Sequence, residues 1–239
     1  SARTLAVIPH ERRILHVLPR EFMVDDQEGV REPLGMSGNR LEVNVHVITG
    51  STTAAQNTVT CVNRAGLDVV DIILQPLASS EAVLSAEERE LGVAMVDLGG
   101  GTTDLAIFLD GSIRHTAVLP IGGQNLTKDL AIGLLTSQTD AEKIKVQHGI
   151  ARTELVHGHQ MVEVPSVGDR PPRQFTRRDI AEILEPRVEE MFDLVKREIV
   201  RAGYEGMLGA GVVITGGTSL LEGMPDAAER GLNLPARRG

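Results

Sequence analysis

The stretch GVAMVDLGGGTTDLAIFL, residues 92–109, decides the fold class of this chain of 239 residues. Two apolar runs, Gly92 to Val96 and Leu105 to Leu109, flank a turn that contains three consecutive glycines. Short apolar runs bounded by turn residues are typical of buried β-strands. We therefore predict a β-hairpin with a glycine-rich tip.

The tip of this hairpin has the composition of a phosphate-binding loop. Its three glycines lack side chains, so their backbone N–H groups can approach a phosphate chain closely. Thr102 and Thr103 add hydroxyl donors, and Asp97, at the end of a strand, can hold Mg²⁺ through the water ligands of the ion. Asp104 would then brace the turn. The same residues also allow a tight glycine hairpin without a ligand.

A second glycine-rich turn follows the apolar run Val212 to Ile214, in the sequence Thr215-Gly216-Gly217-Thr218. A glycine pair at the point where a strand gives way to a helix is the usual ligand position in open α/β sheets. A close-packed turn is the alternative. Two such turns in one chain are more specific than either alone.

Composition excludes several classes of protein. The chain has 33 acidic and 24 basic residues, a formal charge of -9, which argues against a broad nucleic-acid-binding face. Cys61 is the single cysteine, so an internal disulfide framework is excluded and a cytoplasmic location is expected. No apolar run approaches the roughly 20 residues of a membrane-spanning helix.

The remaining apolar periodicities predict further elements. We expect strands at Arg13 to Leu18, Leu41 to Thr49, Val69 to Leu74, Ile113 to Pro120 and Met161 to Val164. We expect helices from Ser51 to Gly66, from Leu77 to Leu84, from about Gln124, and from Thr176 as N-cap to near Gly203. Pro186 should kink or divide the last of these helices, and residues 165–173 should form a loop rich in proline and arginine.

The two glycine-rich turns together resemble the phosphate-2 and adenosine motifs of the actin, MreB and DnaK superfamily. Within that superfamily, nearly the whole chain resembles the bacterial cell-division family FtsA. The segments that carry this resemblance are ILHVLPREF at 14–22, QEGVR at 27–31, PLGMSG at 33–38, RHTAV at 114–118 and VPSVGDRPPR at 164–173.

The resemblance implies an α/β, actin-like ATPase (ribonuclease H-like) fold with the 1C (SHS2) insertion of FtsA. Residues 1–49 would be part of subdomain 1C, and residues 50–90 part of subdomain 1A. Residues 91–137 and 205–239 would form the nucleotide-binding subdomain 2A, with 138–204 as subdomain 2B. The phosphate-1 loop and the basic amphipathic membrane helix of the family have no counterpart here, so we expect a partial chain with its N-terminal part missing.

The resemblance also implies roles for individual residues, with ATP and Mg²⁺ as cofactors. It assigns Mg²⁺ to Asp97, and it assigns nucleotide contacts to Gly99, Gly100, Gly101, Thr102, Thr103, Glu142, Lys145, Gly216, Gly217 and Thr218. Glu142 and Lys145 are three residues apart and share a helix face; read without the family, they are an ordinary solvated charge pair.

Two further assignments concern activity and partners. Gln75 falls where related ATPases orient the attacking water, but glutamine is a poor base, so hydrolysis should be slow. A polar residue at a strand end is the alternative. Four arginines of residues 138–204 lie where FtsA proteins dock the C-terminal tail of FtsZ. A solvated face is the alternative. The four are Arg170, Arg173, Arg177 and Arg178.

By this resemblance the intact protein would be a cytoskeletal adaptor. It would bind ATP, associate with itself into filaments, contact FtsZ and other division proteins, and anchor FtsZ filaments to the cytoplasmic face of the inner membrane through a C-terminal helix. The competing reading is a metabolic or chaperone-type ATPase or sugar kinase of the same superfamily. A relative of the pilus-assembly ATPases is a third, which would share the loops but not the 1C-like opening segment.

Overall fold

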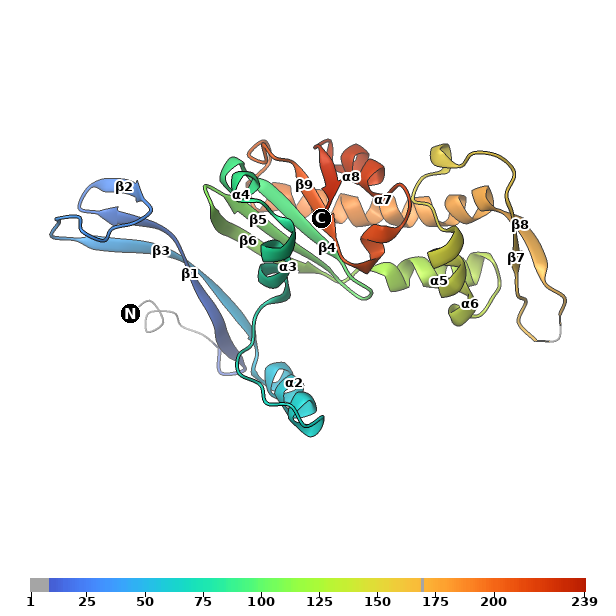
Figure 1. Ribbon diagram of the computed structural model, residues 1–239, viewed down its shortest axis with the longest axis horizontal. Coiled ribbons are helices and arrows are strands. Elements are labelled where there is room, and N and C mark those ends of the chain that lie inside the picture. The colour runs from blue at the N-terminus through green and yellow to red at the C-terminus, as the bar shows by residue number, and fades with distance from the viewer. Residues whose placement is uncertain (1–8, 169) are drawn as a thin grey trace.

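A five-stranded mixed sheet of order β10-β9-β4-β5-β6 is the centre of the computed structural model, which describes residues 9–168 and 170–239 (Figure 1). Its strands are β4 (Val93–Leu98), β5 (Thr103–Leu109), β6 (Ser112–Leu119), β9 (Val212–Thr215) and β10 (Ala236–Arg238). β4, β5 and β6 pair antiparallel, whereas β9 runs parallel to β4. The predicted hairpin with its glycine-rich tip is confirmed, while β10 was not predicted.

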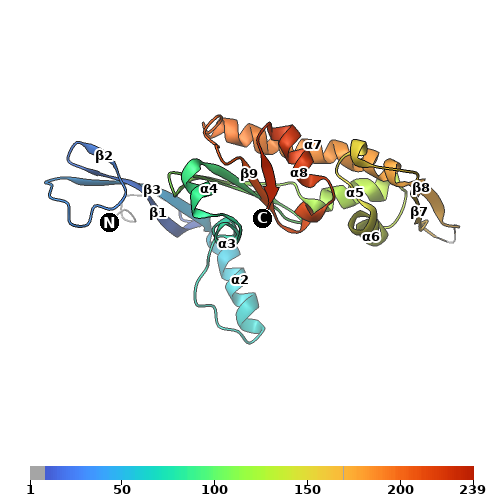
Figure 2. The same cartoon turned by 45° about the horizontal axis from the view of Figure 1, so that its top comes forward.

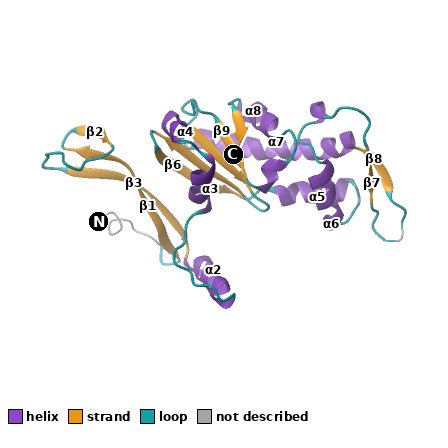
Figure 3. Cartoon of the chain, in the orientation of Figure 1, coloured by secondary structure: helices purple, strands orange, loops and turns teal. Residues whose placement is uncertain are grey.

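Helices cover both faces of this sheet (Figure 3). Alternate residues of a strand point to opposite faces, so Ala94 and Val96 pack on one side of β4, and Val93 and Met95 on the other. The first side meets α5 (Gly123–Gly133), α7 (Arg177–Arg201) and α8 (Met224–Leu232). The second meets α3 (Gln75–Val83), and the short helix α4 (Ala86–Leu91) leads into β4. Every residue of β4 is buried.

A second sheet, of order β2-β1-β3, extends away from the first in both views (Figures 1 and 2). It consists of β1 (Arg12–Val24), β2 (Gln27–Val30) and β3 (Leu41–Ser51), all antiparallel. Helix α2 (Thr52–Arg64) follows, and Ser51 caps it by accepting a hydrogen bond from the N–H of Ala54. The two predicted strands and the helix after them are confirmed. Residues 1–8 of the predicted 1C segment lie outside the described residues.

The strand predicted at Val69 to Leu74 is wrong. Residues 67–74 have no regular secondary structure, and the side chain of Val70 is 98% exposed. A β-strand needs a neighbouring strand to accept its backbone hydrogen bonds, and none lies alongside in the described part of the chain. The N–H of Leu74 donates instead to the imidazole Nε2 of His16, at 3.0 Å.

The segment between α5 and α7 forms a small unit at one end of the molecule (Figure 1). It contains α6 (Gln138–His148), a 3₁₀ turn η1 (Thr153–Leu155), β7 (Met161–Val164) and β8 (Arg173–Thr176). β7 was predicted, whereas β8, which pairs with it, was not, because a four-residue segment with a single apolar residue, Phe175, next to a proline-rich loop gives little strand signal.

Helix α7 begins at the predicted cap, where Thr176 accepts a hydrogen bond from the N–H of Asp179 and the Asp179 carboxylate accepts one in return. Pro186 lies inside the helix and does not divide it. Leu184 and Val188, on either side of the proline, are fully buried, so packing holds the helix together. One hydrophobic cluster contains residues of α7 and of the central sheet, and the predicted boundaries of 2A and 2B stay predictions.

Among the helices of the described residues, none is both long enough and apolar enough to cross a bilayer. The strand β9 leads into a 3₁₀ turn, η2 (Gly217–Leu220), and then into α8. The sequence predicts a short helix between this glycine-rich turn and Gly223, where the structure has the 3₁₀ turn, and α8 after Gly223 was not predicted. Because β9 runs parallel to β4 with Asp97 opposite Thr215, the two glycine-rich turns leave the sheet at the same edge.

Candidate functional site

The two glycine-rich turns contact each other at this edge of the sheet. The hydroxyl of Thr218 donates a hydrogen bond of 2.9 Å to the carbonyl of Gly99. The start of α5 closes the group, because the N–H of Gly123 also donates to Gly99, at 2.9 Å, and the N–H of Gln124 donates to Gly100, at 2.8 Å. Three segments distant in sequence therefore form one backbone-lined site.

Close packing requires glycine at some of these positions and leaves others open. Gly216 has φ +84°, and a Cβ there would lie 2.4 Å from Asp97 Oδ1 and 2.6 Å from the Leu98 carbonyl. By contrast, a Cβ on Gly101 or Gly217 would meet no atom within 4 Å in the residues that the structure describes. The backbone at Gly101 and Gly217 is therefore open to a ligand.

Asp97 and Asp104 place two carboxylates side by side below the loop, since they are directly opposed on β4 and β5. Asp97 is 4% exposed, and its Oδ2 accepts hydrogen bonds from Gln75 Nε2, at 3.0 Å, and Ser79 Oγ, at 2.8 Å. Burial raises the pKa of Asp104; a hydrogen bond from Thr102 opposes this effect, and the charge of Asp97 adds to it.

Two nearby carboxylates are compatible with a cation, which would relieve their mutual repulsion. The described residues contain no group of three or more His, Cys, Asp or Glu side chains that could bind a metal directly. A cation here would therefore need water and ligand oxygens to complete its coordination, the arrangement that Mg²⁺ prefers. The magnesium role of Asp97 stays a prediction.

The two threonines of the loop differ in their surroundings. Thr102 is exposed and donates to Asp104 Oδ2 at 3.2 Å. Thr103 is fully buried, and its hydroxyl donates to the carbonyl of Ile121 at 2.8 Å. The hydroxyl of Thr103 thus braces the loop against the segment that leads into α5, and its proton is used in that contact.

Glu142 and Lys145 face the site from α6. Lys145 Nζ donates to the carbonyl of Gly123 at 3.0 Å, to Thr127 Oγ1 at 2.9 Å and to Glu142 Oε2 at 2.8 Å. Burial by itself would raise the pKa of Glu142, but hydrogen bonds from Lys145 and Thr127 outweigh it, so the pKa is lowered. Lys145 is thus tied into the fold, whereas Glu142 remains partly exposed to solvent, and the nucleotide role of the pair stays a prediction.

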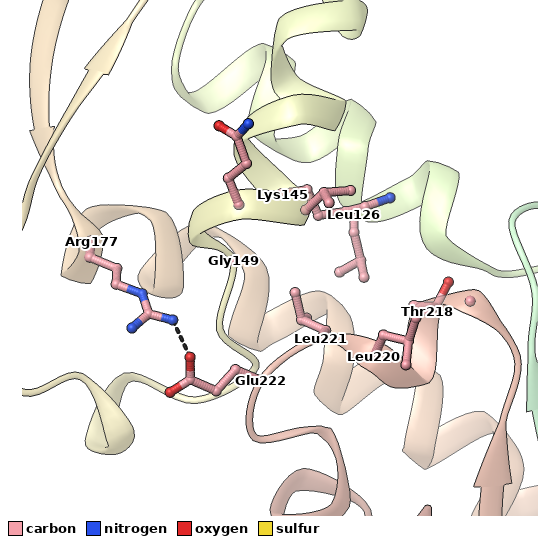
Figure 4. A pocket seen from close by; sticks show the side chains of 11 residues that line it. Leu126, Lys145, Gly149, Arg177, Thr218, Leu220, Leu221 and Glu222 are labelled. Atoms are coloured by element: carbon pink, nitrogen blue, oxygen red, sulfur yellow. Dashed lines mark hydrogen bonds and ion pairs between the residues drawn. The ribbon is translucent and has the colours of Figure 1, made fainter. Parts of the chain in front are cut away.

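These segments surround a cavity of about 760 Å³, which we call the larger cavity. Its lining includes the loop residue Gly100, the start of α5, Glu142 and Lys145 of α6, and Gly217 and Thr218. An adjoining cavity of about 290 Å³, the smaller cavity, shares Lys145 and Thr218 with it (Figure 4). The sequence therefore predicted residues from three separate segments that the fold brings to one place.

Sequence reasoning missed Ser79 and Thr127. Ser79 lies one helical turn after Gln75, so both reach Asp97 from one face of α3. Thr127 has the same relation to Gly123, whose carbonyl it contacts. Helical spacing was the available signal, but it identifies a shared face only after the contact partner is known.

The four arginines do not gather into one patch. Arg173 donates to the carbonyl of Leu134, and its guanidinium lies 5.2 Å from the ring centre of Phe175. Arg177 pairs with Glu222 at the smaller cavity, and Arg178 pairs with Glu182 along α7. Arg170 and Arg173 line a separate cavity of about 510 Å³ beside Val167 and Leu135.

Comparison with known proteins decides the family. The model of the family "Cell division protein FtsA" matches residues 94–239, and that of the "SHS2 domain inserted in FTSA" matches residues 1–49. The chain belongs to the FtsA family of cell division proteins. Its SHS2 segment begins before the described residues, at Ser1, and includes β1, β2 and most of β3.

Curated relatives agree with this family. The cell division protein FtsA of Pseudomonas aeruginosa is 51% identical over all of this chain, which covers 57% of that protein. The FtsA of Escherichia coli K12 is 45% identical over 96% of this chain, which covers 56% of it. This FtsA-family chain therefore spans a little over half the length of the relatives that it matches.

Solved structures show the same actin-like fold. MreB5 of Spiroplasma citri bound to ADP has a TM-score of 0.62 at 20% identity, over 80% of this chain and 61% of that one. A MamK double helical filament has a TM-score of 0.51 at 17% identity, over 62% of this chain and 49% of that one.

The PilM–PilN type IV pilus biogenesis complex has a TM-score of 0.70 at 17% identity, over 100% of this chain and 59% of the matched one. The expectation that a pilus-assembly relative would lack the opening segment is therefore wrong at the level of fold. The FtsA models and relatives separate the two at the level of sequence, and they do not favour a sugar kinase or chaperone.

Proposed function

We propose that this FtsA-family chain carries one half of the ATP site of an actin-like cell-division protein. The observation that carries the proposal is the contact of Thr218 with Gly99, which joins the two glycine-rich turns at the rim of the larger cavity. Open backbone at Gly101 and Gly217 supplies N–H donors of the kind that bind phosphate.

The parts of a nucleotide match different walls of the site. The phosphates would lie against the loop of Gly99, Gly100, Gly101 and Thr102, with Mg²⁺ between them and Asp97. The ribose hydroxyls would meet Glu142 and Lys145, whose side chains are held at the cavity by Thr127 and Gly123. The base would lie beyond Gly216, Gly217 and Thr218, towards the smaller cavity.

Hydrolysis would be slow in such a site. Gln75 donates its amide N–H to Asp97, so its carbonyl oxygen can orient a water molecule. An amide is not a base at neutral pH, and general-base catalysis contributes typically about 10²–10⁴-fold when it is present. The nucleotide would therefore act as a conformational switch in the intact protein.

The intact protein would link FtsZ filaments to the cytoplasmic face of the inner membrane at the division site. Family membership supports a division role, and the filament formed by MamK, a protein of similar fold, supports self-association. FtsZ would dock on the 2B segment, where Arg170 and Arg173 line a cavity with apolar neighbours suited to an acidic peptide with an apolar anchor.

Titration with a fluorescent ATP analogue in the presence of Mg²⁺ tests the nucleotide site. The chain would be compared with a form extended to the length of its curated relatives, and each with Asp97→Ala and the control Asp68→Ala, an exposed loop residue. We expect saturable binding by the extended form that Asp97→Ala weakens and Asp68→Ala does not. Absence of binding by the extended form would contradict the proposal.

A further inference from the structure

The smaller cavity has an apolar wall and a charged end (Figure 4). Leu126, Leu220 and Leu221 line one side, and Arg177 and Glu222 lie together on the other, joined by an ion pair. A planar heterocycle needs apolar contact on its faces and polar groups at its edge. The cavity offers both kinds of surface.

Backbone contacts fix the charged end in place. Arg177 Nε donates to the carbonyl of His148 at 3.1 Å, which ties the start of α7 to the end of α6. The backbone carbonyl of Glu222 accepts from the N–H of Ala151 at 2.8 Å. At Gly149, between these contacts, a Cβ would lie 2.3 Å from the Lys145 carbonyl, so the close approach of the chain there requires glycine.

The smaller cavity continues the larger one in the direction away from the phosphate loop. Both are lined by Lys145, Val146, Gly217 and Thr218. Val146 on α6 and Leu220 on η2 both line the smaller cavity and are 74% and 69% exposed. A ligand whose ring lay against them would remove both from water.

We propose that Glu222, oriented by Arg177, selects a purine with an amino group at position 6 over one with a carbonyl there. This inference rests on the proposed nucleotide site. A carboxylate only accepts hydrogen bonds, and with one oxygen bound to Arg177 it has acceptor capacity left for an amino N–H. A 6-carbonyl would bring two acceptors together with no proton between them, which costs binding energy.

The exposure of the pair favours Glu222 over Arg177 as the group that meets the base. The Glu222 side chain is 57% exposed, whereas that of Arg177 is 20% exposed and is bound to both Glu222 and the His148 carbonyl. If Arg177 were the reader, its N–H groups would favour a 6-carbonyl, and the preference would have the opposite sign.

The experiment compares the affinities of ATP and ITP in a form of the protein extended to the length of its curated relatives. The two bases differ at position 6, amino against carbonyl, and at N1, which carries a proton only in ITP. We expect about tenfold tighter binding of ATP, a modest ratio because the carboxylate is partly solvated. Glu222→Gln, whose amide can donate as well as accept, should bring the ratio close to one. Glu222→Asp, with the carboxylate drawn back by one methylene, should give an intermediate ratio.

The control is Glu154→Gln, which removes a carboxylate of similar exposure that pairs with Arg152 outside the smaller cavity. It should leave the ratio unchanged. ATP binding with a ratio that Glu222→Gln does not alter, or a preference for ITP, would overturn this inference alone. Failure of the unaltered protein to bind either nucleotide would overturn the proposed function as well.

Discussion

Thr218 Oγ1 lies 2.9 Å from the carbonyl oxygen of Gly99, although the two residues are 119 positions apart in the chain. Thr218 is 9% exposed, so little water can replace this hydrogen bond. The contact holds the turn after β9 against the turn after β4. It thereby fixes the distance between the parts of the site proposed for the phosphates and for the base.

Replacing Thr218 with valine should lower the free energy of unfolding by about 1 kcal/mol, because valine keeps the shape of threonine but removes one of the two donors to the Gly99 carbonyl, the other being the N–H of Gly123. Thr218→Ser retains the hydroxyl and should lose less. Urea unfolding monitored by circular dichroism measures both variants. Equal stabilities for valine and serine would show that the hydrogen bond is unimportant.

Gly216→Ala should be more damaging than Gly217→Ala. An alanine at position 216 would have to keep the φ of +84°, and its Cβ would collide with Asp97 Oδ1 and the Leu98 carbonyl. A Cβ at Gly217 would meet no atom within 4 Å in the described part of the chain. We expect a loss of about 1–3 kcal/mol at Gly216. Thermal unfolding of the two variants side by side is the measurement, and similar melting temperatures would contradict the packing described here.

Lys145→Met should weaken nucleotide binding at least about tenfold, because hydrogen bonds to a charged group contribute about 1.5–3 kcal/mol. The Lys145 side chain is 12% exposed and contacts the ribose region proposed above. Lys143→Met is the matched control, since Lys143 lies on the same helix, is 63% exposed and pairs with Asp140 instead. Titration with the fluorescent ATP analogue should separate the two variants.

The contact between β3 and β6, which we call the joint between the two sheets, should become less stable in acid because His46 becomes protonated. Burial, then the charge of Arg20 on β1, then His115 on β6, lower the pKa of His46, whose ring also lies 3.2 Å from Thr116 Oγ1. The folded state therefore binds the His46 proton less readily than the unfolded state, in which the pKa is about 6.5. Its contribution is present above that pH and is lost below it.

Hydrogen exchange of β3 at pH 7.5 and pH 5.5 measures this effect. His46→Gln should reduce the difference between the two pH values, whereas His157→Gln, in an exposed loop, should not. Both variants retain the other charged groups near the joint, among them Arg114 and Glu198, so a difference between the variants reports on His46. An unchanged pH dependence in His46→Gln would rule out His46 as the titrating group.

The sequence by itself determined the elements that depend on interactions between residues close together in the chain. Two short apolar runs separated by consecutive glycines specify the hairpin of β4 and β5, and Thr176 with Asp179 specifies the start of α7. Candidate residues of the site could also be named one segment at a time, because a phosphate-binding loop needs glycines, although a tight turn without a ligand fits the same residues. Segments typical of FtsA made the family readable from sequence as well.

Only the tertiary structure decided what these residues touch. Residues 67–74 have the apolar pattern of a strand but lack a partner in the described chain, so pattern alone misled. The hydroxyls of Thr102 and Thr103 look equivalent in sequence, yet the hydroxyl of Thr103 is directed into the core. Arg177 belongs with Glu222, 45 positions away, and not with its neighbour Arg178. A side chain's partner depends on which segments the fold brings together, and a local sequence pattern does not specify contacts between distant segments.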